Sequence, residues 1–201
     1  VIPSKDHSNV LQVCLESLKN QENIEIVVVD NGSCNSEKQK YEELKVKNGF
    51  NYIYNPMEFN FSKMCNLGAK AATGEYILFL NDDIEAGKEP GLSEGKAGGV
   101  GNWLFNMLSH AKKSHVGAVG AKLYYPDSEI IQHAGITNLR LGPVHKMQFL
   151  QDVRPYYDGR NVYDVNVLAV TGACLMMRKA LFEECGGFSE DLAVAFNDVE
   201  L

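Results

Sequence analysis

The feature of this sequence that most restricts its fold is a regular alternation of short apolar runs and amphipathic segments over residues 1–85. The apolar runs that predict strands cover residues 1–3, 24–29, 50–54 and 76–80. Between them, apolar residues spaced three and four apart predict helices near Ser8, over 36–47 and over 60–72. Strands that alternate with helices form parallel sheets with helices on both faces. We therefore predict an α/β fold with a Rossmann-like, mostly parallel sheet.

The pattern changes after residue 85. Glycines crowd residues 87–101 and predict a loop, and its two Gly-Lys pairs lack the Ser or Thr that follows in a phosphate-binding P-loop. Beyond this loop, we expect a helix over 103–113, strands over 116–121, 130–136, 165–170 and 174–178, and a short helix over 181–184. The polar section between 124 and 165, which Pro and Gly interrupt, indicates a smaller region of mixed structure.

Composition narrows the class of protein. The 201 residues carry a net charge of −7, which argues against a nucleic-acid partner because such proteins need a basic surface. No apolar run reaches the roughly 20 residues that cross a bilayer, and no stretch has the charged start and apolar middle that predict a signal peptide. The five cysteines form no CxxC pair, which favours reduced thiols and a cytoplasmic setting. From its first and last residues, Val1 in a strand and Leu201 after an acidic cluster, we expect a piece cut at both ends from a longer protein.

Polar residues follow three of the predicted strands directly. They are Pro3-Ser4-Lys5-Asp6, Asp30 and Asn81-Asp82-Asp83. If the strands are parallel, these clusters line one edge of the sheet, where open α/β folds bind their ligands. The turn that follows the first strand contains no Gly, which argues against a nicotinamide dinucleotide as the ligand.

The clusters allow functional and structural interpretations. Asn81-Asp82-Asp83 offers the oxygen ligands that Mg²⁺ or Mn²⁺ prefers, or it forms a solvated turn that caps a helix. Asp30 could bind a ribose hydroxyl or a base N–H, or it is simply the first residue of an Asp-Asn-Gly turn. Lys63 is either a nucleotide contact or a solubilising charge. Asp198 suits a general base near a sugar phosphate, or it belongs to an ordinary helix start.

Five segments in order carry a resemblance to a known family. They read VIPSKD, VVVDNGS, FSKMCNLGAKAATGEYILFLNDD, TGACLMMRKALFEECGGF and FNDVEL. In this combination the chain resembles the nucleotide-sugar-dependent inverting glycosyltransferases of family 2, which have the GT-A fold. The resemblance runs from Val1 to Leu201.

The resemblance implies roles along the nucleotide edge. Pro3 and Ser4 match the first loop, which meets the nucleoside, and Asp30 matches an aspartate that binds the base or ribose. Lys63 matches a basic position near the base. Asn81-Asp82-Asp83 matches the D-x-D metal motif with Asn81 in place of its first Asp. The resemblance therefore places Asn81 and Asp82 beside the nucleotide and makes Asp83 the direct ligand of Mg²⁺ or Mn²⁺.

The later segments imply an acceptor side. Thr171-Gly172-Ala173 matches a loop that lines the cleft for donor sugar and acceptor. Asp198 matches the catalytic base of the family's Glu-Asp pair, with Asn197 in place of the Glu. His133 and His145 fall in segments that line the acceptor cleft in similar sequences. We expect one catalytic domain over 1–201, in which 1–121 bind the nucleotide-sugar and 122–201 form the acceptor side.

The implied activity is metal-dependent transfer of a sugar from a nucleotide-diphospho-sugar to a hydroxyl of a glycan or lipid-linked sugar. UDP- and dTDP-sugars are the implied donors, polysaccharide biosynthesis is the implied setting, and the inner face of the membrane is the implied location. The alternative is a non-catalytic module that binds nucleotide-sugars. A sugar-phosphate nucleotidyltransferase would begin with a Gly-rich loop bearing Arg and Lys, which is absent here. A glycoside hydrolase would need two carboxylates across one sugar, and Asp83 at a strand end fits a metal better.

Overall fold

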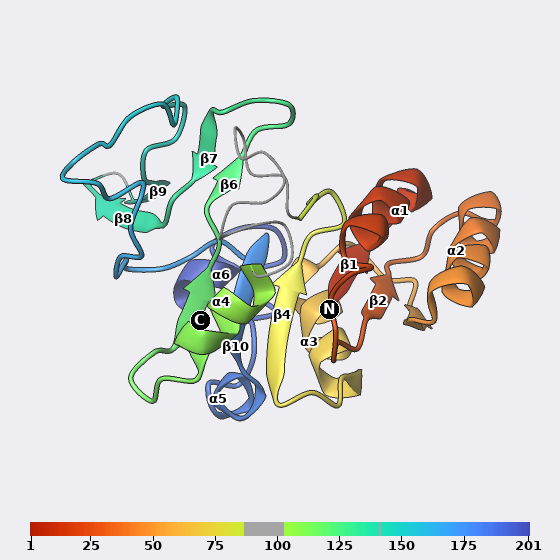
Figure 1. The fold of residues 1–201 in the computed structure, drawn as a ribbon. Coiled ribbons are helices and arrows are strands. Elements are labelled where there is room, and N and C mark those ends of the chain that lie inside the picture. The colour runs from red at the N-terminus through yellow and green to blue at the C-terminus, as the bar shows by residue number, and fades with distance from the viewer. Residues whose placement is uncertain (87–102, 141) are drawn as a thin grey trace.

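The computed structural model describes residues 1–86, 103–140 and 142–201 (Figure 1). Its first sheet is parallel and has the order β1-β2-β3. These strands are β1 (Ile2–Ser4), β2 (Val27–Asp30) and β3 (Asn51–Tyr54). Every residue of β2 is buried, which explains why its sequence is a continuous apolar run up to Asp30 rather than an alternating one.

The second sheet continues the first. Its order is β4-β10-β5, formed by β4 (Tyr76–Leu80), β10 (Cys174–Arg178) and β5 (Ala118–Gly120). The amino group of Val1 donates to the carbonyl of Leu78 at 2.8 Å, and the Leu80 N–H donates to the carbonyl of Val1 at 3.0 Å. These bonds join the start of β1 to β4. Because β10 pairs antiparallel with both of its neighbours, it is the strand that runs against the others.

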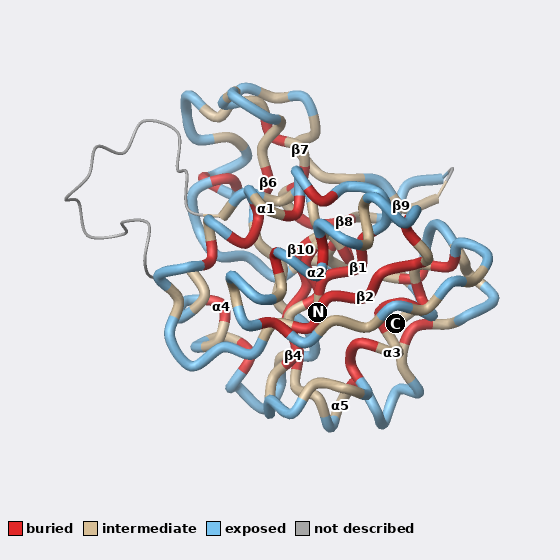
Figure 2. Tube along the Cα trace, turned by 90° about the vertical axis from the view of Figure 1, so that its right-hand side faces the viewer, coloured by how far each residue is buried: buried red, intermediate tan, exposed pale blue. Residues whose placement is uncertain are grey.

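Helices cover both faces of this sheet, as predicted. One face packs against α1 (Ser8–Ser17), α2 (Asn35–Asn48) and α4 (Trp103–Ala111). The other packs against α3 (Phe61–Ala71) and α5 (Lys179–Glu184). The buried residues of the chain follow the strands and the inner faces of these helices (Figure 2). The α/β prediction with a mostly parallel sheet is therefore confirmed.

Local sequence explains where several helices begin and end. The spaced apolar residues of α1, Leu11, Cys14 and Leu15, are all buried against the sheet. Gly49 follows α2 in a left-handed conformation, with φ of 73°, which favours glycine. The side chain of Asn60 caps α3 by accepting a hydrogen bond from the Lys63 N–H at 2.9 Å.

The remaining strands form a smaller region beside the sheet (Figure 1). It contains two antiparallel pairs, β6 with β7 and β8 with β9. Their bounds are Leu123–Tyr124, Ile131–His133, Ile136–Leu139 and Gly142–His145. A four-residue helix, α6 (Asn197–Glu200), lies near the end of the chain.

The structure differs from the sequence prediction in this smaller region. The expected strand over 130–136 is two strands, because Gly135 has φ of 96° and turns the chain between β7 and β8. The expected strand over 165–170 is reduced to one isolated bridge between Ala169 and Ile136. The glycine-rich loop predicted over 87–101 lies outside the described residues. None of the helices in the described ranges has the length and apolar character needed to span a bilayer.

Candidate functional site

The carboxyl ends of β1, β2 and β4 meet the start of β10 at one edge of the sheet. The Ser4 hydroxyl donates to Asp82 Oδ2 at 2.5 Å and also lies 2.6 Å from the Tyr41 hydroxyl. The Asn31 N–H donates to the Ser4 carbonyl at 3.1 Å, and the Asn81 N–H donates to the Ala173 carbonyl at 3.0 Å. The structure thus brings together clusters that the sequence places far apart.

Asp30 is completely buried at this edge. Its Oδ1 accepts hydrogen bonds from the N–H and the hydroxyl of Ser33, at 2.8 and 2.7 Å, and its Oδ2 accepts one from the Tyr52 hydroxyl. Burial, followed by the hydrogen bond to Asp30, raises the pKa of Tyr52, so that this hydroxyl remains a donor. Asp30 therefore organises the turn after β2. Its partner Tyr52 was missed by sequence reasoning, because an aromatic residue in a strand is read only as an apolar one.

Next to Asp30, the amide of Asn31 is buried without a hydrogen-bond partner among the described residues. An unpaired buried amide costs about 1–3 kcal/mol relative to a paired one. A buried polar group without a partner calls for an explanation, and a polar ligand at the sheet edge would supply one. Sequence analysis assigned Asn31 only to the turn after β2.

The two carboxylates that follow β4 differ in environment. Asp82 is partly buried, and burial raises the pKa of its carboxyl, which the hydrogen bond from Ser4 opposes. The Nδ1 atom of His7 lies 3.7 Å from its Oδ2. Asp83 is exposed. Ser4 therefore engages Asp82, while Asp83 is left accessible to a ligand.

The described residues contain no group of three or more His, Cys, Asp or Glu side chains that could hold a metal by themselves. A divalent cation at Asp83 would need oxygens from elsewhere. Mg²⁺ commonly binds in this way, through one or two carboxylates together with phosphate oxygens and water. An exposed carboxylate at the ligand-binding edge fits that type of site.

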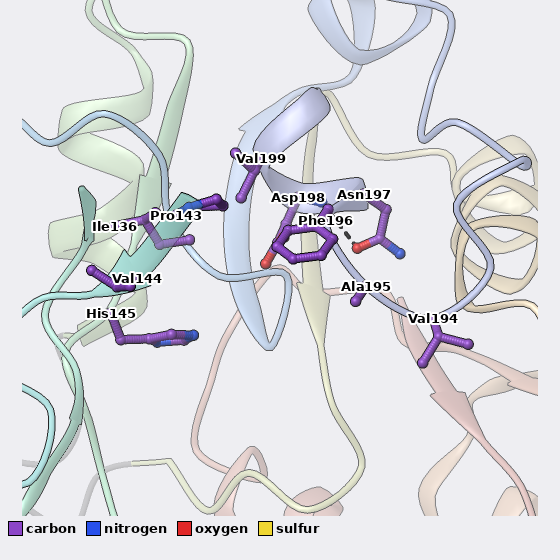
Figure 3. A pocket seen from close by; sticks show the side chains of 10 residues that line it. All are labelled: Ile136, Pro143, Val144, His145, Val194, Ala195, Phe196, Asn197, Asp198 and Val199. Atoms are coloured by element: carbon purple, nitrogen blue, oxygen red, sulfur yellow. Dashed lines mark hydrogen bonds between the residues drawn. The ribbon is translucent and has the colours of Figure 1, made fainter. Parts of the chain in front are cut away.

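A cavity of about 250 Å³ lies beside α6 (Figure 3). Its lining includes Asp198 on one wall and His145 on the other, whose side chains lie on opposite sides of the space. Asp198 Oδ2 accepts a hydrogen bond from the Gly172 N–H at 2.8 Å. The loop that enters β10 therefore fixes this carboxylate. The rest of the lining is largely apolar and comprises Ile136, Pro143, Val144, Val194, Ala195, Phe196, Asn197 and Val199.

Asn197 contacts the start of α3, and Lys63 lies in the first turn of that helix. The Asn197 amide is buried; its nitrogen donates to Ser62 Oγ at 3.2 Å, and its oxygen accepts from the Asp198 N–H at 2.9 Å. Asn197 thus anchors α6 to α3 while it lines the cavity. Lys63 is exposed one residue beyond Ser62.

Phe196 is a lining residue that sequence reasoning missed. It precedes α6 with φ of 65°, a left-handed conformation that costs about 1–2 kcal/mol for a residue with a Cβ atom. Its side chain is 57% exposed although it is a large aromatic group. Strained backbone of this kind is concentrated at binding and catalytic sites. No local sequence signal marks it.

Comparison with known proteins identifies the family. Residues 1–91 match the model of glycosyl transferase family 2. These residues include Ser4, Asp30 and the carboxylates after β4, which form the edge described above. The first part of the chain, residues 1–91, belongs to glycosyl transferase family 2.

Relatives and solved structures extend the likeness over the whole chain. The O-antigen biosynthesis protein RfbC of Myxococcus xanthus is 32% identical over 208 residues, which cover all of this chain and 15% of RfbC. The mannosyltransferase PcManGT of Pyrobaculum calidifontis, solved with GDP-Man and Mn²⁺, matches 99% of this chain with 16% identity and a TM-score of 0.65. Residues 1–349 of TarS of S. aureus, solved with UDP, match 100% of it with 19% identity and a TM-score of 0.57.

The two solved structures share the fold of this chain but are longer. This chain spans 48% of the PcManGT chain and 52% of the TarS chain, so each of them is about twice as long. The structural likeness shows that the family 2 domain has the GT-A fold. Asp198 and His145 lie beyond the residues that the family model matches. The pairing of β10 with β4 joins that second part of the chain to the matched edge.

Proposed function

We propose that this chain transfers a sugar from a nucleotide-diphospho-sugar to an acceptor hydroxyl, with inversion at the anomeric carbon. The observation that carries the proposal is the placement of the Asp198 carboxylate. It lies in a cavity and is held by the Gly172 N–H, in the same loop whose Ala173 carbonyl is bonded to Asn81. One loop therefore contacts both the proposed general base for the acceptor and the sheet edge proposed to bind the donor.

In the proposed reaction, Asp198 takes the proton of an acceptor hydroxyl. The freed oxygen attacks the anomeric carbon and forms the new glycosidic bond, while the bond from that carbon to the diphosphate breaks. The nucleoside diphosphate leaves with the bonding electrons, and the configuration inverts in a single displacement. The Gly172 N–H donates a hydrogen bond to Oδ2 of Asp198, and this bond holds the carboxylate in one orientation. General base catalysis of this kind contributes about 10²–10⁴-fold to a rate.

The donor would lie along the ends of β1, β2 and β4. Asp30 and its hydrogen bonds to Ser33 and Tyr52 give the turn after β2 a fixed shape against which a nucleoside can bind. The buried amide of Asn31 offers a donor and an acceptor that lack protein partners in the described chain. Pro3, Ser4 and Lys63 complete the proposed nucleoside side, and Asn81 and Asp82 the side nearer the phosphates. UDP- and dTDP-sugars remain the donors that we propose.

Asp83 is the residue that would hold Mg²⁺ or Mn²⁺, because its carboxylate is exposed at the edge of the sheet. A cation bound there would neutralise the charge that develops on the departing diphosphate. Asp82 is bonded to Ser4 and supports the same turn. That PcManGT was solved with Mn²⁺ supports the assignment of the metal.

The proposed acceptor is a glycan or lipid-linked sugar, bound between Asp198 and His145 and against Thr171, Gly172 and Ala173. The name of RfbC, an O-antigen biosynthesis protein, supports a role in making polysaccharide. We propose that the protein acts at the inner face of the membrane, as the family resemblance implies.

A donor screen tests the proposal. UDP-, dTDP- and GDP-sugars are added to the full-length protein with and without Mn²⁺, and the unfolding temperature is measured, since a ligand that binds the folded state raises it. The stabilising donor is then incubated with oligosaccharide acceptors, and the anomeric configuration of the product is read by NMR. We expect one donor class to stabilise the protein more strongly with Mn²⁺ and to give an inverted product. A retained configuration would rule out the single displacement, and stabilisation without transfer would favour a binding module.

A further inference from the structure

Two histidines on the acceptor side form a pair whose protons the structure can assign. His133 ends β7 and is 1% exposed, and His145 ends β9 and lines the cavity opposite Asp198. Their Nδ1 atoms lie 2.9 Å apart, and the rings meet edge to face. Two nitrogens at this distance share one proton, so one ring donates and the other accepts.

The other nitrogen of His133 decides which ring donates. Its Nε2 accepts hydrogen bonds from the backbone N–H groups of Gly135, at 3.1 Å, and Thr171, at 3.4 Å. A nitrogen that accepts such bonds carries no proton. Burial, and then the neighbouring His145, lower the pKa of His133 to about 4, so that its ring is neutral at pH 7. The single proton of His133 therefore resides on Nδ1.

The proton of His145 follows from this assignment. Since His133 Nδ1 donates, His145 Nδ1 must accept and be unprotonated. Neutral His145 then carries its proton on Nε2. The tautomer of a histidine is generally set by the partner of its other nitrogen, as it is here.

The same loop that holds His133 also holds Asp198. The Thr171 N–H bonds to His133 Nε2, and the next N–H in the chain, that of Gly172, bonds to Asp198 Oδ2. Asp198 is thus anchored directly to this loop, and His145, on the opposite wall, is anchored to it through His133. A hydrogen-bond donor at His145 and an acceptor at Asp198 are therefore kept in a fixed relation across the space.

We infer that His133 is a positioning residue that locks His145 in the Nε2–H tautomer, and that this N–H binds a hydroxyl or ring oxygen of a saccharide in the cavity. The inference deepens the proposed function and rests on it for the class of ligand. The cavity suits a sugar, because Val194, Phe196 and Pro143 supply apolar walls while Asp198 and His145 supply polar groups. Sugars present both kinds of surface on one ring.

The first measurement needs no turnover. The imidazole nitrogens of ¹⁵N-labelled full-length protein are read by long-range ¹H–¹⁵N NMR, which separates protonated from unprotonated nitrogens. We expect His133 to be protonated on Nδ1 alone and His145 on Nε2 alone at pH 7. A proton on His145 Nδ1, or on His133 Nε2, would overturn the inference. This measurement does not depend on sugar transfer. A wrong tautomer assignment can therefore be distinguished from a failure of the proposed function.

Two substitutions separate positioning from a merely structural role. His133→Asn keeps an N–H donor near the position of Nδ1, whereas His133→Gln keeps an acceptor near the position of Nε2 but loses the donor toward His145. The probes are glucose, mannose, galactose and N-acetylglucosamine, titrated while the Nε2–H resonance of His145 is followed. We expect at least one sugar to shift that resonance, with about tenfold weaker binding to His133→Gln, as loss of one ordered hydrogen bond implies, and less than threefold weaker binding to His133→Asn.

Thermal unfolding of both variants provides the control for folding. Equal loss of sugar binding in His133→Asn and His133→Gln would show that His133 has only a structural role. A His145 resonance that none of the sugars moves would overturn the assignment of the ligand, even if the tautomers are as expected.

Discussion

The carboxylate of Asp198 accepts a hydrogen bond from the backbone N–H of Gly172 at 2.8 Å. A Cβ atom added at Gly172 would lie 3.4 Å from the Phe61 ring and 3.5 Å from Asp198 Cβ, which is ordinary contact distance. The bond is therefore made by the backbone of the loop, and it does not depend on glycine at this position. The proposed base takes its orientation from the loop that enters β10.

Replacement of that base should stop the chemistry and spare donor binding. We expect Asp198→Asn to lower kcat about 10²–10⁴-fold, since the amide cannot take a proton yet can still accept from Gly172. Transfer rate and donor affinity are measured separately, by product formation and by calorimetric titration. Near-normal transfer with unchanged donor affinity would remove Asp198 from the role of base.

The two aspartates after β4 should respond differently to the same change. Asp83→Asn should reduce the Mn²⁺-dependent part of donor stabilisation by most of its value and leave the unfolding temperature of the free protein unchanged, because this side chain is exposed. Asp82→Asn is the matched control. Burial disfavours the charged form of Asp82. Replacement by the uncharged amide should therefore leave the unfolding temperature at pH 7 unchanged or raise it. Equal loss of metal dependence in both variants would argue against Asp83 as the direct ligand.

Asp30 should contribute to stability as well as to nucleotide binding. In Asp30→Ala, the N–H and hydroxyl of Ser33 and the hydroxyl of Tyr52 lose their acceptor, which should lower the free energy of unfolding by about 1–3 kcal/mol. Tyr52→Phe removes one donor but leaves the carboxylate, and it should cost about 1 kcal/mol. Urea denaturation and nucleotide titration are compared for the two. The prediction fails if Tyr52→Phe weakens nucleotide binding as much as Asp30→Ala does.

We expect Phe196 to lower the stability of the folded chain and to contribute to acceptor binding. Phe196→Gly relieves the left-handed strain and should be about 1 kcal/mol more stable than Phe196→Ala, which keeps a Cβ atom at φ of 65°. Both variants lose the ring that lines the cavity, so both should raise the KM for the acceptor. The measurements are urea denaturation and acceptor titration. A lower stability of the glycine variant would contradict the assignment of strain.

His133 should make folding stability depend on pH in a defined window. Its pKa is about 4 in the folded chain and near 6.5 when unfolded, so between these values the unfolded chain binds the extra proton. The stability that neutral His133 contributes is fully present above about pH 6.5 and is lost as pH falls toward 4. Urea denaturation at pH 7, 6 and 5 should show the wild type losing stability relative to His133→Asn. His145 is the titratable partner in contact with it, and His145→Asn controls for its charge. A constant difference across these pH values would contradict the prediction.

Much of the fold could be predicted because it is encoded locally. The burial of Leu11, Cys14 and Leu15 follows from their spacing, and the full burial of Val27–Asp30 follows from an unbroken apolar run. The contact between Ser4 and Asp82 follows from a general rule, because parallel strands end at a common edge. The resemblance to a family added roles for these residues, which remain predictions.

Other features could not be predicted, because they depend on non-local neighbours. Residues 130–136 read as one strand, yet Gly135 turns the chain where Val167 approaches so closely that an added Cβ would lie 2.4 Å from its Cγ1. That turn is what places the Gly135 N–H on His133 Nε2. The partnership of Tyr52 with Asp30 is equally invisible along the chain, since each belongs to a different strand.

By itself, the sequence determined the helices and strands of residues 1–85 and the polar residues that end those strands, because periodicity and turn residues act over a few positions. Only the tertiary structure decided that β10 enters the sheet antiparallel between β4 and β5, with Cys174 opposite Leu80. This direction carries Thr171–Ala173 to the ligand edge and brings His133 and Asp198 onto adjacent peptide units of one loop. Strand direction and pairing depend on hydrogen bonds between segments that are distant in the chain, and no local pattern records them.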